Sequence, residues 1–364
     1  MNDRERILAL LSGEVPDRVP WFGDLAYWAG AMEYRGQVPE GWQRMPDYYR
    51  FHRELGVGFY LQGYWAFKES RSPEITIEVH DDGNAHVECV HTPLGTLESE
   101  TRFLPEACTS APIRHMINTP EDLRILRYLL ERTDYAPNPD EALRRRPWVG
   151  EQGIVLLYLP RSPFMELNVN LAGINSVVNL WLDARDEFEA TLAFMGERYD
   201  QAAEAALRVP ADAFMIPENL SSEVVGRFYA RYVRPWERKW TARIREMGKH
   251  SFIHMDGTLG LLGQVGQAGF DVIEAFTPKP VGDASIHEVR AMAGPDPILW
   301  GGVPGIFFTP LVTDAEFEHH VREVLEVMVA DRRMVLGVAD QVPPDGLRSR
   351  VAQVIELVER YGRY

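Results

Sequence analysis

The chain has 364 residues, of which 45% are hydrophobic and 25% are charged. This length is long for one ordinary domain but normal for an α/β barrel with an insertion, and the composition is that of a soluble globular protein. The formal net charge is −16, and no stretch of the sequence forms a basic stripe. We therefore do not expect nucleic acid as a partner.

The two cysteines, Cys89 and Cys108, have neither metal-ligand spacing nor the pattern of a disulfide framework, which favours a reducing compartment. The opening segment MNDRERILALLSG is charged and helical in pattern, unlike a secretory signal. No apolar run approaches the ~20 residues that a membrane-spanning helix needs. We expect a cytoplasmic protein with no membrane partner, and the sequence leaves a homodimer open.

Apolar runs of strand length alternate with helical patterns along the chain, which is the rhythm of a parallel sheet. Runs such as IVLLYL are almost continuously apolar, as strands buried on both faces are. The sequence therefore predicts one α/β domain over residues 1–364, a TIM-type (β/α)8 barrel. Its expected strands are Val19–Asp24, Val57–Gln62, Ile154–Pro160, Ala213–Pro217, Ser251–Asp256, Val272–Phe276, Ile298–Gly302 and Met334–Asp340.

Two segments depart from this rhythm. Glu74–Leu104 predicts an antiparallel hairpin, because DDGN between alternating strands is a strong turn signal. We place this hairpin as an excursion after the second strand. Tyr135–Pro147 is rich in Pro and Arg and is predicted to be a surface connection. The expected helices of the second half are Ser222–Met247, Gly260–Ala268, Ser285–Ala293, Asp314–Ala330 and Asp345–Tyr361.

Residues at the carboxyl ends of barrel strands converge on one mouth, where active sites of this fold lie. Several carboxylates follow the predicted strands, and such groups repel one another unless a cation or a shared proton neutralises them. We expect Glu218, Glu274 and Asp340 to be the catalytic acids. The expected substrate-binding residues are Asp24, Tyr158, Arg161, Asn219, Trp300 and Gln341.

The pair His254-x-Asp256 is the sharpest feature of this mouth, because residues two apart on a strand share a face. With Asp340 the pair makes a three-ligand set that suits zinc or another divalent ion and leaves a position open. Glu218 or Glu274 could replace one member of the set. In the alternative interpretation, His254 only bonds a neighbouring strand and Asp256 only caps a helix. Trp300 likewise has a packing alternative, since glycines follow it.

The segments RERILALLSGEVPDRVPW, FIHMDGTLGLLGQVGQAGFDVIEAFTPKPVGD and ILWGGVPG resemble uroporphyrinogen-decarboxylase-like proteins. The resemblance covers nearly the whole chain. That superfamily contains decarboxylases of uroporphyrinogen III and cobalamin-dependent methyltransferases, including the thiol methyltransferases and those of O-demethylase systems. The resemblance implies a TIM barrel that performs one of these two chemistries.

Two departures from the family patterns favour methyl transfer. The decarboxylases carry an arginine-rich first loop and a histidine in the last strand loop, whereas this chain has VPWFGDLAYWAGAM and VADQVPPD there. The thiol methyltransferases carry a His-x-Cys pair and a later Cys as zinc ligands. Here His254 matches the histidine, Asp256 replaces the first Cys, and Asp340 lies in the loop of the second. The resemblance thus implies a methyltransferase-like barrel with an altered metal site.

Carboxylate ligands leave a metal a harder Lewis acid than thiolates do, which suits an oxygen rather than a sulfur. We therefore expect methyl transfer from a small methoxy or methylated compound to a corrinoid (cobalamin) on a partner protein, with metal or acid activation of the leaving oxygen. The alternatives are a carboxy-lyase for a small organic acid and a non-catalytic ligand-binding member. Uroporphyrinogen itself is not expected to bind, because its carboxylates would enter an acidic mouth.

Overall fold

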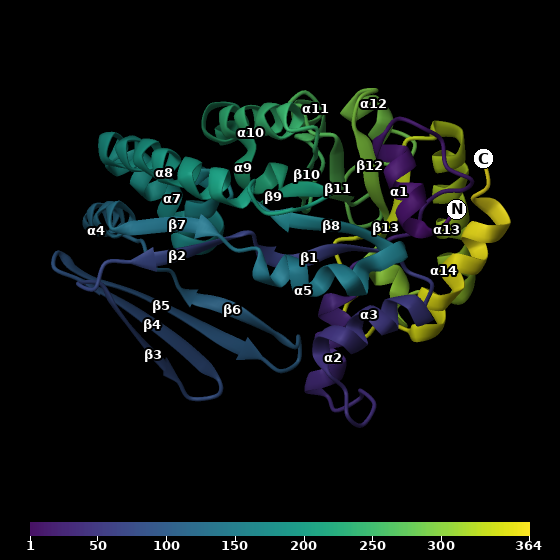
Figure 1. The fold of residues 1–364 in the computed structure, drawn as a ribbon, viewed down its shortest axis with the longest axis horizontal. Helices are drawn as coiled ribbons and strands as arrows, with labels where there is room; N and C mark the ends of the chain where they lie inside the picture. Colours follow the sequence, from purple (N-terminus) through teal and green to yellow (C-terminus); the bar gives the residue numbers. More distant parts are fainter.

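The computed structural model describes residues 1–364, apart from the side chains of Leu61 and Gln62. A seven-stranded parallel sheet in the order β1-β8-β9-β10-β11-β12-β13 curls through the centre, with helices around its outside (Figure 1). Its strands are β1 (Phe59–Trp65), β8 (Gly153–Tyr158), β9 (Ala213–Leu220), β10 (His250–Met255), β11 (Val272–Phe276), β12 (Ile298–Pro304) and β13 (Met334–Ala339).

The segment predicted as the first strand, Val19–Asp24, closes this sheet into a ring. Trp21 forms an isolated parallel bridge with Leu336 of β13, and Phe22 forms one with Gly58 next to β1. A Cβ atom at Gly58 would lie 2.6 Å from the Phe22 ring, so only glycine permits this approach. The TIM-type barrel is confirmed, with its eighth strand reduced to these bridges.

Large side chains fill the interior of the barrel. Trp300 has no exposed surface, and its ring centroid lies 4.4 Å from that of Tyr60, 5.1 Å from Phe22 and 5.7 Å from Phe252. Helix α1 (Asp3–Leu11) adds Ile7 to the same cluster. Trp300, expected to bind substrate, is therefore a packing residue, because its position on β12 points it into the barrel core.

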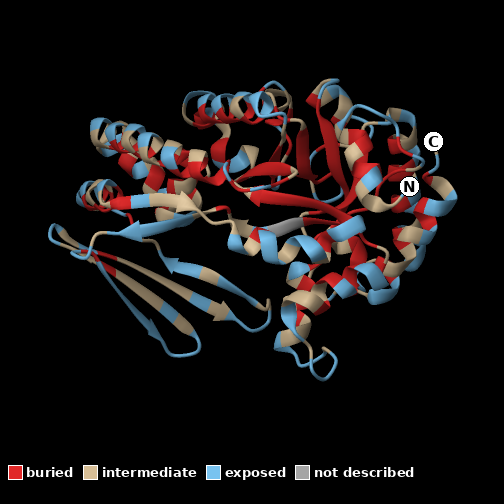
Figure 2. Ribbon diagram, viewed as in Figure 1, coloured by how far each residue is buried: buried red, intermediate tan, exposed pale blue. Residues whose placement is uncertain are grey.

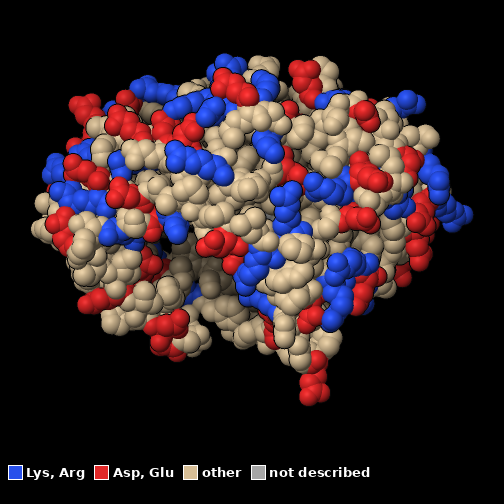
Figure 3. Space-filling view, viewed as in Figure 1, with Lys and Arg blue, Asp and Glu red and all other residues tan. Residues whose placement is uncertain are grey.

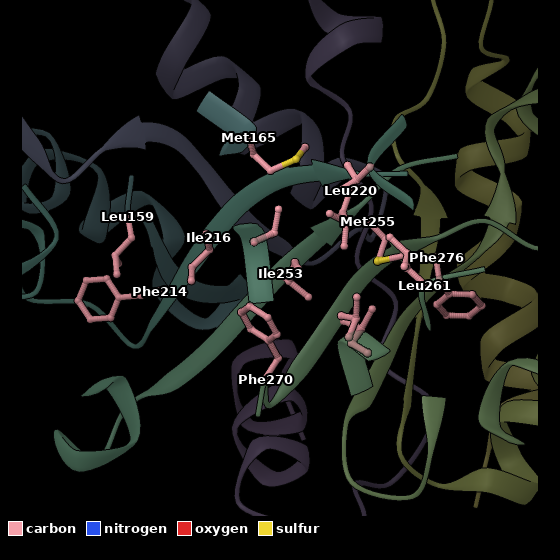
Figure 4. Close-up of a cluster of buried hydrophobic side chains, with 14 of the residues drawn as sticks. Leu159, Met165, Phe214, Ile216, Leu220, Ile253, Met255, Leu261, Phe270 and Phe276 are labelled. Atoms are coloured by element: carbon pink, nitrogen blue, oxygen red, sulfur yellow. The ribbon is translucent and has the colours of Figure 1, made fainter. Parts of the chain in front are cut away.

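The outward faces of the strands form a second, larger core. Along β9, Phe214 and Ile216 belong to this outer cluster whereas Met215 belongs to the inner one, as alternation along a barrel strand requires. Figure 4 shows Ile216, Ile253 of β10 and neighbouring side chains in this layer. Burial is concentrated in the barrel strands and the helix faces that cover them (Figure 2).

Helices cover the outside of the barrel and flank its mouth. Helix α13 begins at a capping box formed by Thr313 and Glu316, a sequence signature of a helix start. The longer helices are α2 (Ala26–Tyr34), α3 (Arg44–Glu54), α4 (Pro120–Glu131), α5 (Asp140–Val149), α7 (Gly173–Asp183), α8 (Arg185–Ala206), α10 (Arg234–Glu246), α13 (Asp314–Asp331) and α14 (Arg348–Tyr361). The shorter ones are α6 (Pro163–Glu166), α9 (Ser222–Val225), α11 (Leu262–Gly266) and α12 (Val289–Ala293).

The helix predicted over Ser222–Met247 is broken. It comprises α9, a 3-10 turn η3 (Gly226–Phe228), a π-helical turn η4 (Tyr229–Val233) and α10. Gly226 has a φ of +30°, which an α-helix does not tolerate, and Pro235 lacks a backbone donor at the start of α10. The other expected helices are present but shorter, except that α13 runs one residue longer.

The predicted hairpin Glu74–Leu104 is part of a larger four-stranded antiparallel sheet that lies outside the barrel (Figure 1). It comprises β3 (Thr76–Asp81), β4 (Ala85–Thr92), β5 (Gly95–Leu104) and β6 (Thr109–Arg114). The predicted turn is present, with Asp82 accepting backbone hydrogen bonds from Asn84 and Ala85. The fourth strand was missed, because TSAPIR contains a proline and lacks a hydrophobic alternation.

The segment predicted as a surface connection, Tyr135–Pro147, is instead largely regular. Its start belongs to β7 (Thr133–Pro137), which pairs antiparallel with β2 (Phe67–Arg71), and α5 follows. This pairing joins residues far apart in the sequence, so local composition gave no signal of it. Among the residues that the structure describes, no helix is both long and apolar enough to cross a membrane.

Candidate active site at the barrel mouth

Glu274 is the centre of the hydrogen-bond network at the mouth. It pairs in register with His254 on the adjacent strand, and its Oε2 lies 2.6 Å from Nδ1 of that histidine. The hydroxyl of Tyr60 on β1 donates to Oε1, also at 2.6 Å. Glu274 has no exposed surface, so this carboxylate is held from both sides in a buried position.

Asp340 completes the network on the far side of His254. It follows β13 directly, and its Oδ1 lies 3.7 Å from Nε2 of the histidine. Its φ of +70° is unusual for a residue with a side chain, and Asn219 and Ala275, at the ends of β9 and β11, share this property with φ values of +52° and +63°. Such backbone strain gathers at functional sites, where the surrounding fold enforces it.

Asp24 lies at the edge of the network, after the closing segment. Its Oδ1 accepts from the backbone N of Ala26 at 2.7 Å and faces the hydroxyl of Tyr48 at 3.4 Å. Burial raises the pKa of Asp24 to about 7, and the negative charges of Asp340 and Glu274 act in the same direction. The hydrogen bond from the backbone N of Ala26 lowers the pKa but does not outweigh these effects. At neutral pH a large fraction of Asp24 therefore carries a proton.

His254 has the opposite character. Burial disfavours its charged form, but the adjacent Glu274, with smaller effects from Asp340 and Asp256, outweighs burial and raises the pKa of His254 to about 9. The pKa of Asp340 is raised by burial and held back by the histidine. The mouth thus combines an imidazolium cation with carboxyl groups that hold protons unusually well.

A cavity of about 310 Å³ opens beside Asp24, between α2, α3 and the ends of β1 and β8. Its walls include the aromatic rings of Trp42, Tyr48, Phe59 and Tyr158. Burial raises the pKa of Tyr158 above its ordinary value, so this phenol remains protonated and can donate a hydrogen bond. The cavity therefore has aromatic walls and a polar end formed by Asp24, and the charged residues Glu33, Arg44 and Arg145 also line it.

Arg161 and Asn219 lie on another part of the rim. Nη2 of the arginine is 3.3 Å from Oδ1 of Asn219, and Nη1 is 3.7 Å from Oε2 of Glu166. The guanidinium carbon lies 5.4 Å from the centre of the Trp65 ring. These contacts are long for an arginine, so Arg161 retains donors for a ligand. Gln341, also expected to bind substrate, accepts from the backbone N of Tyr27 at 3.1 Å and fixes the start of α2.

Glu218, expected to be catalytic, is buried beneath the rim. Its oxygens accept from Ser162, whose backbone N and hydroxyl lie 3.1 and 3.2 Å away. Burial raises its pKa to about 7, against the bonds from Ser162. Nearby Glu237 is equally buried and is bonded by the hydroxyl of Tyr229, and its pKa is raised by burial and by Glu218. This second acid pair is separate from the Glu274 network.

The expected metal ligands do not assemble into a three-ligand site. Among the described side chains, no group of three or more His, Cys, Asp and Glu residues could hold a metal ion. Asp256 is exposed and lies beyond the last residue of β10, so strand alternation no longer directs it. Nδ1 of His254 is engaged by Glu274, and its Nε2 lies 3.7 Å from Oδ1 of Asp340. The residues present do not fit the expected zinc set.

Several residues of the mouth escaped the sequence analysis. Tyr60 and Tyr48 contact the carboxylates directly, and Ser162 and Glu237 frame Glu218. A signal existed for Tyr60 alone, because a polar-tipped aromatic at an inward strand position requires a partner. The others come from helices or loops whose approach to the rim is set by tertiary packing.

The chain is similar in fold to a methyltransferase from Methanosarcina mazei, with a TM-score of 0.64 and 17% sequence identity over 99% of each chain. A second solved structure, a putative vitamin-B12 independent methionine synthase from Listeria monocytogenes, gives a TM-score of 0.40 and 11% identity over 95% of this chain and 98% of that one. No curated protein sequence matches the chain. The first likeness supports the fold, and the second is too distant to carry an argument.

The family model for uroporphyrinogen decarboxylase (URO-D) matches residues 162–361, more than half of the chain. The matched region includes β9 to β13 and therefore His254, Glu274 and Asp340. On this match, the chain belongs to the uroporphyrinogen decarboxylase family.

Proposed function

We propose that this protein is a methyltransferase that moves a methyl group from a small aromatic methoxy compound to a corrinoid carried by a partner protein. The observation that carries the proposal is Asp24, a carboxyl group with a pKa of about 7 at the polar end of an aromatic-walled cavity. Membership of the family and the likeness in fold to a methyltransferase are consistent with it.

The cavity favours a flat, small methyl donor. Its volume of about 310 Å³ is at the lower end of the range of ~300–1,000 Å³ for small-molecule pockets, enough for one substituted ring. Trp42, Tyr48 and Tyr158 line the cavity and are only partly buried, and aromatic faces of this kind stack well on an aryl ether. The ether oxygen would lie at the polar end, within reach of Asp24.

Asp24 would act as the general acid. When the bond between the methyl carbon and the ether oxygen breaks, its electron pair remains on the oxygen, which takes the proton of Asp24 and leaves as a phenol. The corrinoid supplies the nucleophile that accepts the methyl group. Asp24 is left as a carboxylate, and the imidazolium of His254 stabilises that charge. Tyr60 and Glu274 hold this histidine in place.

Access to the mouth is compatible with a protein partner. The face shown in Figure 3 is hollowed between the antiparallel sheet β3–β6 and the elements above it. The tip of that sheet contacts α2, where Tyr27 bonds the backbone oxygen of Ala107 and the ring of Tyr34 lies 4.8 Å from that of Phe103. The sheet and α2 therefore frame one side of the mouth.

The test is an assay of methyl transfer to free cob(I)alamin with a panel of methoxybenzenes. We expect phenol and methylated corrinoid to form in equal amounts. Chromatography measures the phenol, and the visible spectrum of the corrinoid measures its methylation. Turnover should depend on the protein and be competed by the demethylated phenol. If no methoxybenzene is turned over and no phenol binds the cavity, the proposal is wrong.

A carboxy-lyase acting on a small organic acid is a second candidate, favoured by Arg161. Its guanidinium has only long contacts at the rim and could bind a substrate carboxylate. Release of carbon dioxide from aromatic acids in the absence of any corrinoid would favour this reaction over methyl transfer.

A further inference from the structure

We propose that a second cavity, beside the rim at the ends of β1 and β8, is a binding site for a small methylated ammonium cation. The cavity has a volume of about 330 Å³. It is separate from the cavity at Asp24, and its binding can be measured without any methyl transfer, so the inference does not rest on the proposed function. We refer to it as the ammonium pocket.

Aromatic rings form much of the wall of the ammonium pocket. Trp65 at the end of β1, Phe67 on β2 and Tyr199 on α8 all line it. The rings of Trp65 and Phe67 are 5.8 Å apart and inclined at 52°, so they form two sides of a corner rather than a flat stack. Rings set at an angle around a cavity present several π faces to one guest, which is the arrangement that recognises quaternary ammonium groups.

The charges that line the pocket have one sign. Glu69 and Glu166 line it, together with the amide of Asn170, and no Lys, Arg or His is among its described lining residues. Glu69 is already paired with Arg71, whose Nη2 lies 3.0 Å from its Oε2, so Glu166 is the less compensated of the two carboxylates. An anionic ligand would be repelled, and a neutral donor would gain a hydrogen bond without the charge attraction that a cation has. Aromatic faces together with carboxylates select an organic cation.

Glu166 retains capacity for such a cation. The nearest guanidinium is Arg161, whose Nη1 lies 3.7 Å from Oε2 of Glu166, beyond hydrogen-bond distance. Asn170 donates a neutral hydrogen bond to the same carboxylate at 2.9 Å. Burial raises the pKa of Glu166, although Arg161 and Asn170 both act to lower it. These two neighbours therefore compensate only part of the cost of burying the carboxylate charge. A bound cation would supply the missing charge.

The backbone next to Glu166 has an uncommon form. A π-helical turn, η2 (Leu167–Leu171), follows α6 directly and carries Asn170 to the wall of the pocket. Single π-turns are rare and occur frequently at functional sites. On the opposite side, Trp65 makes an edge contact of 5.7 Å with Tyr158, which lines the cavity at Asp24. The two cavities are therefore neighbours across one aromatic pair.

The experiment is isothermal titration calorimetry of the full chain with choline, tetramethylammonium and the neutral isostere 3,3-dimethylbutan-1-ol. We expect choline to bind at least ~10-fold more tightly than the alcohol, because the alcohol has the same shape without the charge. Equal binding of choline and the alcohol, or no binding of either cation, would overturn the proposal.

Substitutions in the lining test whether choline binds in the ammonium pocket. Glu69→Gln and Glu166→Gln should each weaken choline binding several-fold and leave the alcohol unaffected, and Tyr199→Leu should weaken both. Glu69 is partly exposed on β2, so its substitution keeps the test valid even if a buried variant fails to fold. Glu131→Gln, an exposed carboxylate on α4, is the matched control and should bind choline like the parent chain. Unchanged choline affinity in both glutamine variants of the pocket would contradict the assignment.

Discussion

The hydroxyl of Tyr60 lies 2.6 Å from Oε1 of Glu274, and neither side chain is open to solvent. Tyr60 belongs to β1 and Glu274 to β11, which are not neighbours in the sheet, so the bond crosses the interior of the barrel. The phenol and the imidazole of His254 together satisfy a carboxylate that would otherwise be costly to bury. Burial raises the pKa of Tyr60 well above its ordinary value, and the charge of the adjacent Glu274 adds to this effect. The phenol therefore stays protonated and remains a hydrogen-bond donor.

Tyr60→Phe should therefore destabilise the protein. The substitution leaves a buried carboxylate oxygen without its donor, a change that costs about 1–3 kcal/mol. Urea unfolding followed by fluorescence measures the free energy of unfolding. Tyr34→Phe is the matched control, because Tyr34 is 56% exposed and its change should stay within about 0.5 kcal/mol. Equal stability of the two variants would show that the bond contributes little.

The contribution of His254 to stability should decline in alkali. Its pKa rises from 6.5 in the unfolded chain to about 9 in the folded one, where Glu274 outweighs the effect of burial. The stabilisation is therefore complete below pH 6.5 and is lost as the pH rises through 9, with a total on the order of 3 kcal/mol.

The measurement is the difference in unfolding free energy between the parent chain and His254→Gln from pH 6 to pH 9.5. The difference should be largest at pH 6 and shrink steadily above pH 6.5. His287→Gln serves as the control, since His287 is 60% exposed and contacts Glu323 at the surface. A difference for His254→Gln that is flat across this range would contradict the assignment of a charged imidazole.

Glu218→Gln should stabilise the protein at high pH. Burial raises the pKa of Glu218 from 4.5 in the unfolded chain to about 7 in the folded one. The parent chain therefore loses stability as the pH rises from 4.5 to about 7, because ionisation is easier in the unfolded state than at the buried site. Glutamine cannot ionise and avoids a loss on the order of 3 kcal/mol. Unfolding in urea at pH 5 and pH 8.5 tests this, with Glu326→Gln, at an exposed position on α13, for comparison. A variant less stable than the parent at pH 8.5 would rule it out.

Much of the barrel could be predicted from the sequence, because its strands are buried on both faces and are therefore apolar along their length. His254, Glu274, Asp340 and Asp24 were placed at one mouth for the same reason, since parallel strands end together. The strands outside the barrel, β2 to β7, were harder to predict. These strands are mostly exposed, and the pairing of β2 with β7 depends on contacts between residues distant in sequence.

The detailed geometry of the mouth did not follow from strand alternation. The rule that residues two apart share a face ends where the strand ends, and Asp256 and Asp340 both lie one residue beyond. Pairing between β9 and β10 is irregular at the same level, between Ile253 and Met255. Bulges at barrel rims redirect side chains, so the ligand set expected from spacing was not formed.

Asp24→Asn should abolish most of the proposed methyl transfer while leaving the fold intact. Asparagine keeps an oxygen for the backbone N of Ala26, which lies 2.7 Å from the carboxylate in the parent chain, but it cannot give a proton to a leaving oxygen. Loss of a general acid lowers rates by about 10²–10⁴-fold, so turnover at pH 6 should fall by at least ~100-fold.

The dependence of turnover on pH separates this role from simple substrate binding. In the parent chain, kcat should fall as the pH rises above 7, because burial sets the pKa of Asp24 to about 7 and only the protonated form is active. The residual activity of Asp24→Asn should lack this decline. Asp345→Asn, in the loop after β13 with 72% of its side chain exposed, should keep the parent profile. If parent kcat instead rises between pH 6 and pH 8, or Asp24→Asn keeps the parent rate at pH 6, Asp24 is not the proton donor.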